Sequence, residues 1–144
     1  MTTGATQTLS FHASCVSWQG RAALILGPSG VGKSSLALQL MALGCLLVSD
    51  DQTLLSPKGD ALWAAAPDAL RGRIEARGLG LLAAETARRA RVVLAVDLEQ
   101  GETDRLPPER WRNLCGLSIP LVHKVEGSHF PAAVLQYIKA GRVA

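Results

Sequence analysis

The sequence has few aromatic residues, few cysteines and no long apolar run. Only 4% of its 144 residues are Phe, Trp or Tyr. With no basic run either, the chain lacks the stacking surfaces and charge clusters typical of nucleic-acid-binding proteins. No apolar stretch approaches the ~18 residues that span a membrane. The start, from Met1 to Gln7, is small and polar, which argues against a secretory signal peptide.

Cys15, Cys45 and Cys115 are odd in number and far apart, without a C-x-x-C pair. This pattern favours buried free thiols in a reducing cytoplasm over disulfides or a metal site. The composition, 48% hydrophobic and 19% charged, is that of a globular protein, and the length suits a single domain. The net charge of +3 is mild and suits anionic ligands in general.

One stretch fits the phosphate-binding-loop (Walker A) pattern G-x-x-x-x-G-K-[ST] without a mismatch. Its residues are Gly27, Pro28, Ser29, Gly30, Val31, Gly32, Lys33 and Ser34. Glycines let a backbone wrap closely around an anion and point its N–H groups at phosphate oxygens. The lysine of this pattern reaches the β- and γ-phosphates of a nucleotide, and the final hydroxyl binds Mg²⁺. The loop therefore predicts that the phosphate groups of a nucleotide bind here, with Mg²⁺ at Ser34.

The surroundings of the loop agree with this interpretation. The apolar run Ala22–Leu26 is bounded by Gly20 and Gly27 and predicts a buried strand before the loop. The strong helix formers of 36–43 stop at Gly44 and predict a helix after it. Strand, loop and helix follow one another as the motif requires.

Further apolar runs predict the rest of the fold. Strands are expected at Phe11–Trp18, Cys45–Ser49 and Arg91–Asp97, a hairpin at 53–65 with its turn at Pro57 and Gly59, a tight connection at Gln19-Gly20, and a last helix at Pro131–Ala140. The segment 73–82 is expected to be a loop. Together these elements predict one α/β domain over residues 1–144, with a P-loop-containing mixed sheet and flanking helices.

Asp50 and Asp51 form the second notable feature, at the carboxyl end of a predicted strand. Open α/β sheets bind ligands beyond such strand ends. One acid there is usual for Mg²⁺ in P-loop enzymes, and a second one offers a proton acceptor for a hydroxyl nucleophile. The alternative is a solvated turn.

Three more residues are candidates only in combination. His12, alone in an apolar strand, is more often a hydrogen-bonded structural residue. Glu75 stands between two arginines and two glycines, in a segment that could bring a carboxylate to a metal or phosphate. Arg105 taken alone is an ordinary surface residue.

Taken together, these features resemble the catalytic domain of the HPr kinase/phosphorylase family. The resemblance runs from the Phe11-His12-Ala13-Ser14 stretch to Arg105-Leu106 and includes the phosphate loop and the paired acids in Leu47-Val48-Ser49-Asp50-Asp51. Its most specific part is the run Ile74-Glu75-Ala76-Arg77-Gly78-Leu79-Gly80-Leu81-Leu82, which looks like the family signature.

The resemblance implies a protein-serine kinase that uses ATP and Mg²⁺ and phosphorylates HPr, the small phosphocarrier of a bacterial phosphotransferase system. It implies that Lys33, His12 and Arg105 are catalytic and that Asp51 is the proton acceptor. It implies metal ligation by Ser34 and Glu75, to which the residue-level reasoning adds Asp50. The family forms hexamers, so a homo-oligomer is also implied.

The chain departs from the family pattern in two places. It begins shortly before His12, which makes it resemble a short form without the additional N-terminal domain of many members. The arginine-rich C-terminal element linked to the phosphorylase reaction has its counterpart at 120–127, where His123 and Lys124 replace the expected arginine. The resemblance therefore implies the kinase reaction more strongly than the phosphorylase reaction.

Two other functions remain open at the level of sequence. A P-loop kinase or nucleotidase for a small molecule would keep Lys33, Ser34 and Asp51 but would need a closed substrate pocket, for which the chain has little remaining sequence. A non-catalytic nucleotide-binding regulatory module would need only the loop.

Overall fold

A long strand, β9 (Arg89–Gly101), runs through the sheet and is joined to the glycine-loop strand β3 (Arg21–Leu26) in the computed structural model, which describes residues 7–144. The helices are α1 (Lys33–Ala42) and α2 (Phe130–Ala140), and a short 3-10 helix covers Asp68–Leu70. The other strands are β1 (Leu9–Phe11), β2 (Ala13–Trp18), β4 (Leu46–Ser49), β5 (Thr53–Lys58), β6 (Ala61–Ala65), β7 (Arg73–Ala76), β8 (Gly80–Ala83), β10 (Arg110–Leu114) and β11 (Leu117–Lys124).

The main sheet is mixed, with the order β1-β5-β6-β9-β3-β2-β4. β3 and β9 run parallel, with Leu26 opposite Asp97, and β2 joins β3 as an antiparallel neighbour. The start of β9 pairs with β6, whereas its later part pairs in parallel with β11, which carries β10 on its other side. The mixed sheet with its two helices confirms the predicted fold class.

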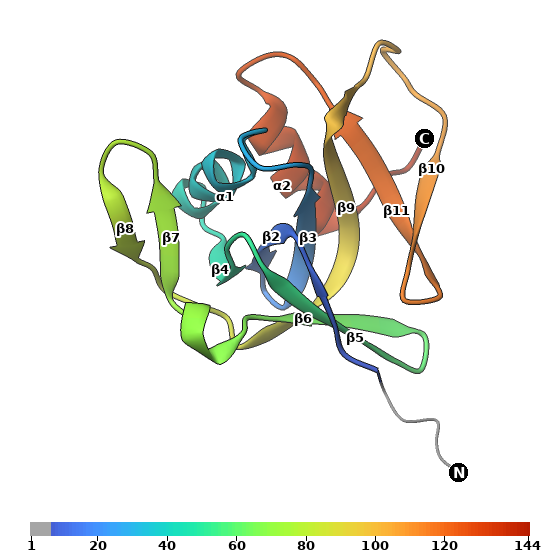
Figure 1. Ribbon diagram of the computed structural model, residues 1–144. Coiled ribbons are helices and arrows are strands. Elements are labelled where there is room, and N and C mark those ends of the chain that lie inside the picture. The colour runs from blue at the N-terminus through green and yellow to red at the C-terminus, as the bar shows by residue number, and fades with distance from the viewer. Residues whose placement is uncertain (1–6) are drawn as a thin grey trace.

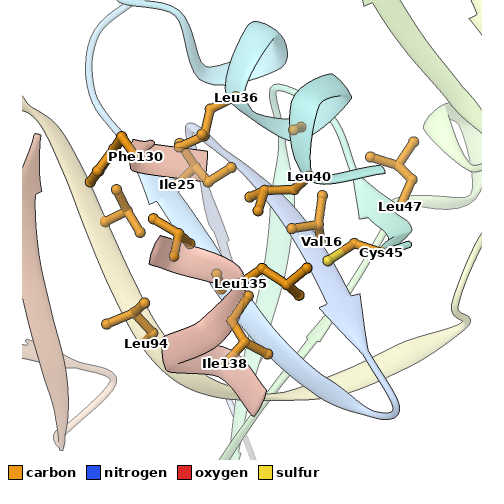
Figure 2. Close-up of a cluster of buried hydrophobic side chains, with 14 of the residues drawn as sticks. Val16, Ile25, Leu36, Leu40, Cys45, Leu47, Leu94, Phe130, Leu135 and Ile138 are labelled. Carbon is orange, nitrogen blue, oxygen red and sulfur yellow. The ribbon is translucent and has the colours of Figure 1, made fainter. Parts of the chain in front are cut away.

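Both faces of β3 are buried because side chains alternate along a strand. Ala23 and Ile25 face the cluster under the two helices, and Figure 2 shows Ile25 there among helix and strand side chains. Ala22, Leu24 and Leu26 face a second cluster, formed with side chains of β5, β6, β10 and β11. A strand enclosed on both sides gives the loop that follows it a rigid base.

The two helices lie beside each other on one side of the sheet (Figure 1). α1 buries Leu36 and Leu40, and α2 buries Leu135 and Ile138 against the same cluster, as Figure 2 shows. Both helices confirm the sequence prediction within a few residues. No helix in the described part of the chain is long and apolar enough to cross a membrane.

Several details differ from the sequence prediction. The expected loop at 73–82 is the hairpin β7–β8, which stands apart at the left of Figure 1. Pro57 lies within β5 rather than in the turn, and the connection to β6 is only Gly59-Asp60. The strand expected at Phe11–Trp18 is interrupted at His12, and β10 and β11 were not predicted.

Candidate functional site

The glycine loop leaves the end of β3 and returns into α1, as the motif requires. Gly27 has φ +145°, and a Cβ at this position would lie 2.7 Å from Cγ1 of Val31. A larger residue would need a strained backbone and a shift of Val31 or of the loop. Gly32 is the residue before α1, so the free N–H groups of the first helical turn open towards the loop.

The side chain of Lys33 binds to the backbone of this loop. Its ammonium group donates to the carbonyl oxygens of Gly27 at 2.8 Å and of Pro28 at 3.0 Å, and the residue is buried. A buried ammonium needs such partners because its desolvation is costly. A phosphate oxygen entering the loop offers a negatively charged partner in place of neutral carbonyls, so the lysine is positioned to bind an anion.

Asp50 connects the loop helix to the sheet. Its Oδ1 accepts hydrogen bonds from the hydroxyls of Ser34 at 2.6 Å and Ser14 at 2.8 Å, and its Oδ2 accepts the backbone N–H of Glu75 at 2.9 Å. Asp50 is buried, and three donors are what a buried carboxylate requires. The contacts bring together α1, β2, β4 and the β7–β8 hairpin.

Asp51 faces the opposite way and is available to solvent. Its side chain is 66% exposed, and its φ of +69° lies in the left-handed region that non-glycine residues rarely adopt. Its Oδ1 lies 2.8 Å from Nε2 of His12, and the same Nε2 lies 3.4 Å from the hydroxyl of Ser29 in the glycine loop. His12 therefore connects the exposed acid to the loop.

The structure brings most of the predicted residues together but leaves two apart. Glu75 reaches the group through its backbone N–H, while the residue itself is exposed on β7. Arg105 lies in the connection between β9 and β10 and is exposed. Within residues 7–144 it makes no hydrogen bond or ion pair, so any role for it depends on a ligand or a partner.

Ser14 is the residue that the sequence prediction missed. It is fully buried, donates to Asp50 and accepts the backbone N–H of Asp51 at 3.2 Å. No local pattern marks Ser14, because its contacts with Asp50 and Asp51 join residues 36 and 37 positions apart in the sequence. Its neighbour Cys15 is also fully buried, and burial raises the pKa of that thiol, which stays protonated and unreactive.

The oxygen donors around Asp50 suit Mg²⁺. This ion prefers hard oxygen ligands and usually binds through one or two carboxylates together with waters and substrate phosphates. Ser34 and Asp50 supply a hydroxyl and a carboxylate in contact, and Glu75 meets the same carboxylate through its backbone N–H. Among the described residues, no three or more His, Cys, Asp or Glu side chains are grouped so that they could hold a metal ion.

Two of the three free cysteines are buried, as their spacing led us to expect. Cys15 and Cys45 are buried, whereas Cys115, in the turn between β10 and β11, is partly exposed. None of the three contributes to the group around the loop.

Asp50 and Asp51 thus lie beside a glycine-rich strand–loop–helix unit in a mixed α/β sheet. The family model described as HPr Serine kinase C-terminal domain matches residues 4–122. The chain belongs to this family, which confirms the resemblance seen in the sequence.

Curated relatives named HPr kinase/phosphorylase agree with this assignment. The protein of Chloroherpeton thalassium is 35% identical over 125 residues, which cover 78% of this chain and 37% of the relative. That of Cupriavidus necator is 34% identical over 126 residues, covering 79% of this chain and 39% of the relative. That of Mycoplasmopsis pulmonis is 45% identical over 71 residues, which cover 49% of this chain and 23% of the relative. The chain thus spans well under half the length of these relatives.

A solved structure shares the fold. The Hpr(Ser) kinase/phosphatase from Coxiella burnetii superposes with a TM-score of 0.78 at 23% sequence identity, covering 91% of this chain and 94% of that one. The similarity extends over nearly the whole chain, so the arrangement of sheet and helices is that of this structure.

Proposed function

We propose that the chain is an ATP- and Mg²⁺-dependent protein-serine kinase that phosphorylates an HPr-type phosphocarrier. The observation that carries the proposal is the contact of Asp51 with His12, which also reaches Ser29 of the glycine loop. It sets an exposed carboxylate beside the place where a transferable phosphate would bind. The names and the family of the relatives support the same acceptor.

The glycine loop would hold the phosphates of ATP. Its backbone N–H groups and the start of α1 favour negative charge, and Lys33 would exchange its carbonyl partners for phosphate oxygens. Mg²⁺, when bound, neutralises charge on the phosphates, and Ser34, Asp50 and Glu75 are the residues that would hold it. Because the Ser34 hydroxyl donates its hydrogen to Asp50, its lone pairs would stay available to the ion.

The transfer itself needs a base and an in-line acceptor. The Oγ of an HPr serine forms a bond to the γ-phosphorus, the bond from that phosphorus to the β–γ bridging oxygen breaks, and ADP leaves. The serine proton passes to the carboxylate of Asp51, a step that contributes about 10²–10⁴-fold to the rate. His12 orients this carboxylate through its Nε2–H, since an ionised carboxylate only accepts hydrogen bonds. Arg105, free of internal partners within the described residues, would contact the phosphates or the bound acceptor.

The exposure of Asp51 favours a protein acceptor over a small molecule. A carboxylate that is 66% exposed is reached from solvent by a surface loop of another protein. A kinase for a small molecule would need walls around this carboxylate to exclude water. The free thiols suit a cytoplasmic location for the proposed reaction. The phosphorylase reaction is not part of the proposal.

One incubation separates the three functions. The chain is mixed with Mg²⁺, ATP labelled in its γ-phosphate and HPr, and the label is followed. Label on an HPr serine supports the proposal. Label released to water or to a small acceptor supports the small-molecule kinase or nucleotidase. Bound ATP with no transferred label supports the regulatory module, and either of the last two outcomes overturns the proposal.

A further inference from the structure

A cleft of about 220 Å³ opens beside the glycine loop, on the side away from Asp50 and Asp51. The loop contributes Val31 and Gly32 to its wall, and α1 contributes Ser35 and Gln39. The opposite wall is the connection from β11 to α2, which passes above the sheet close to the two helices (Figure 1). Whole ligand sites usually measure ~300–1,000 Å³, so this cleft fits part of a ligand whose remainder lies elsewhere.

We propose that this cleft is the subsite for the base and ribose of the nucleoside triphosphate. The inference rests on the proposed function, because it assumes that the phosphates occupy the glycine loop. Consecutive residues of α1 separate the two regions. Ser34 points its hydroxyl at Asp50, whereas Ser35 lines the cleft. A nucleotide held at the start of α1 would therefore have the metal ion and the phosphate acceptor on the side of Ser34. The cleft next to Ser35 would remain open for the rest of the nucleotide.

The sheet topology supports the same direction. The cleft lies beyond the carboxyl ends of β3, β9 and β11, which are parallel neighbours. Ligands of α/β sheets bind outside the carboxyl ends of such strands. Leu98 near the end of β9, together with Lys124 and Val125 at the end of β11, contributes to the wall. The family match ends at residue 122, so most of the β11–α2 side of the cleft lies outside it.

The chemistry of the walls suits a nucleoside. Val31, Leu98, Val125 and Phe130 offer apolar surface for the face of a base. Gln39 lies one helical turn after Ser35 and brings an amide that both donates and accepts, as the edge of a base requires.

The polar rim suits the hydroxyls of a ribose. Lys124 and Glu126 form an ion pair of 3.8 Å there, with the lysine side chain 42% exposed. The hydroxyl of Ser128 lies on the same rim.

Gly127 shapes the far wall. Its φ is +127°, and a Cβ would lie 2.9 Å from Nδ1 of His129. The carbonyl of Gly127 accepts the N–H of Phe130 at 3.3 Å, which turns the chain into α2. Because of this turn, the connection between β11 and α2 forms one wall of the cleft and leaves the cleft open.

The test compares ATP with inorganic tripolyphosphate, which has the phosphates but no nucleoside. Binding of each is measured by calorimetry with Mg²⁺ present, for the wild-type chain and for Gln39→Leu and Ser128→Trp. We expect ATP to bind at least about tenfold more tightly than tripolyphosphate to the wild type. Gln39→Leu should weaken ATP about 2- to 10-fold, the range for one neutral hydrogen bond, and Ser128→Trp should weaken it more by filling the cleft. Tripolyphosphate affinity should not change in either variant.

Gln136→Leu is the matched control, because Gln136 is an exposed glutamine on α2 outside the cleft. It should leave both affinities unchanged. Retained tripolyphosphate binding shows that each variant is folded. Equal affinities of the wild type for the two ligands, or ATP affinity unchanged in both cleft variants, would overturn the subsite and leave the proposed function standing. Failure of both ligands to bind the wild type would instead overturn the proposed function.

Discussion

Replacing Ser14 with alanine should damage both stability and phosphoryl transfer, although this serine touches no solvent. Its hydroxyl donates to the buried carboxylate of Asp50 at 2.8 Å and accepts the N–H of Asp51 at 3.2 Å. A hydrogen bond to a charged group contributes about 1.5–3 kcal/mol and one between neutral groups about 0.5–1.5 kcal/mol. Ser14→Ala should therefore lower the free energy of unfolding by about 2–4 kcal/mol.

The loss should appear in two assays. For a domain of this size, ~2–4 kcal/mol corresponds to a fall in the melting temperature of roughly 5–15 °C. The rate of HPr phosphorylation should fall about 10- to 100-fold, because the strained backbone of Asp51 loses a contact that fixes its carboxylate. ATP affinity should fall less than the transfer rate, because Ser14 reaches the glycine loop only indirectly, through Asp50 and Ser34.

Ser17→Ala is the matched control for this experiment. Ser17 is another buried serine of β2, but it pairs with Ala22 and Leu46 at the end of the strand far from the acids. Its replacement should leave the transfer rate close to wild type. A Ser14→Ala protein with both wild-type melting temperature and wild-type rate would refute the reasoning that Ser14 holds the acid pair.

Three further predictions concern the loop and the thiols. Lys33→Ala should weaken ATP binding about 10- to 100-fold and slow transfer as well, measured by calorimetry and phosphate incorporation, since a charge-assisted contact is lost. Gly27→Ala should destabilise the fold by about 1–3 kcal/mol in urea unfolding and impair ATP binding, because the added Cβ meets a valine methyl of the same loop. Cys115 should react with a thiol reagent before Cys15 and Cys45, and its rate should keep rising above neutral pH, because burial raises its pKa and only the thiolate reacts.

Each of these predictions has a clear contrary result. Lys58 is an exposed lysine at the end of β5, and Lys58→Ala should bind ATP as the wild type does. An equal loss of ATP affinity in Lys33→Ala and Lys58→Ala would contradict the assignment of the glycine loop as the ATP site. Gly59 has φ +63° with open space around its Cβ position, so Gly59→Ala should spare ATP binding where Gly27→Ala does not. Faster labelling of a buried thiol than of Cys115 would contradict the burial pattern.

The loop and its flanking elements were predictable because the requirements are local. Gly27 must be a glycine for steric reasons within its own loop, and the strand before it is apolar because both of its faces are buried. The helix after it ends where its apolar residues end. In such a unit, sequence neighbours are also spatial neighbours, so the pattern carries the structure.

The elements that were missed depend on distant parts of the chain. In β7, Ile74 and Ala76 are buried and their neighbours in the strand are exposed, but a run of four residues is too short to distinguish a strand from a loop by its pattern. β10 contains two arginines and an asparagine and is a strand because β11 pairs with it. The parallel pairing of β11 with β9 joins residues far apart in the sequence, for which a local pattern holds no signal.

Within the site, too, local features were predictable from the sequence and long-range contacts were not. The pair Asp50 and Asp51 was visible as a motif, yet their division into a buried and an exposed carboxylate was not. It depends on Ser14, 36 residues before Asp50, and on the left-handed backbone of Asp51. The family resemblance pointed to His12, but its contact with Asp51, 39 residues further along the chain, was visible only in the structure.

The most direct test of the central claim is phosphate transfer to HPr by the Asp51→Asn variant. The exchange keeps the size of the side chain and a hydrogen-bonding partner for His12 but removes the base. We predict that wild-type protein with ATP and Mg²⁺ adds one phosphoryl group to an HPr serine, detected by mass spectrometry. Asp51→Asn should lose about 10²–10⁴-fold of that rate while its ATP affinity is unchanged. Asp60→Asn, in the exposed β5–β6 turn, should be fully active. An Asp51→Asn protein that phosphorylates HPr at the wild-type rate would contradict the account.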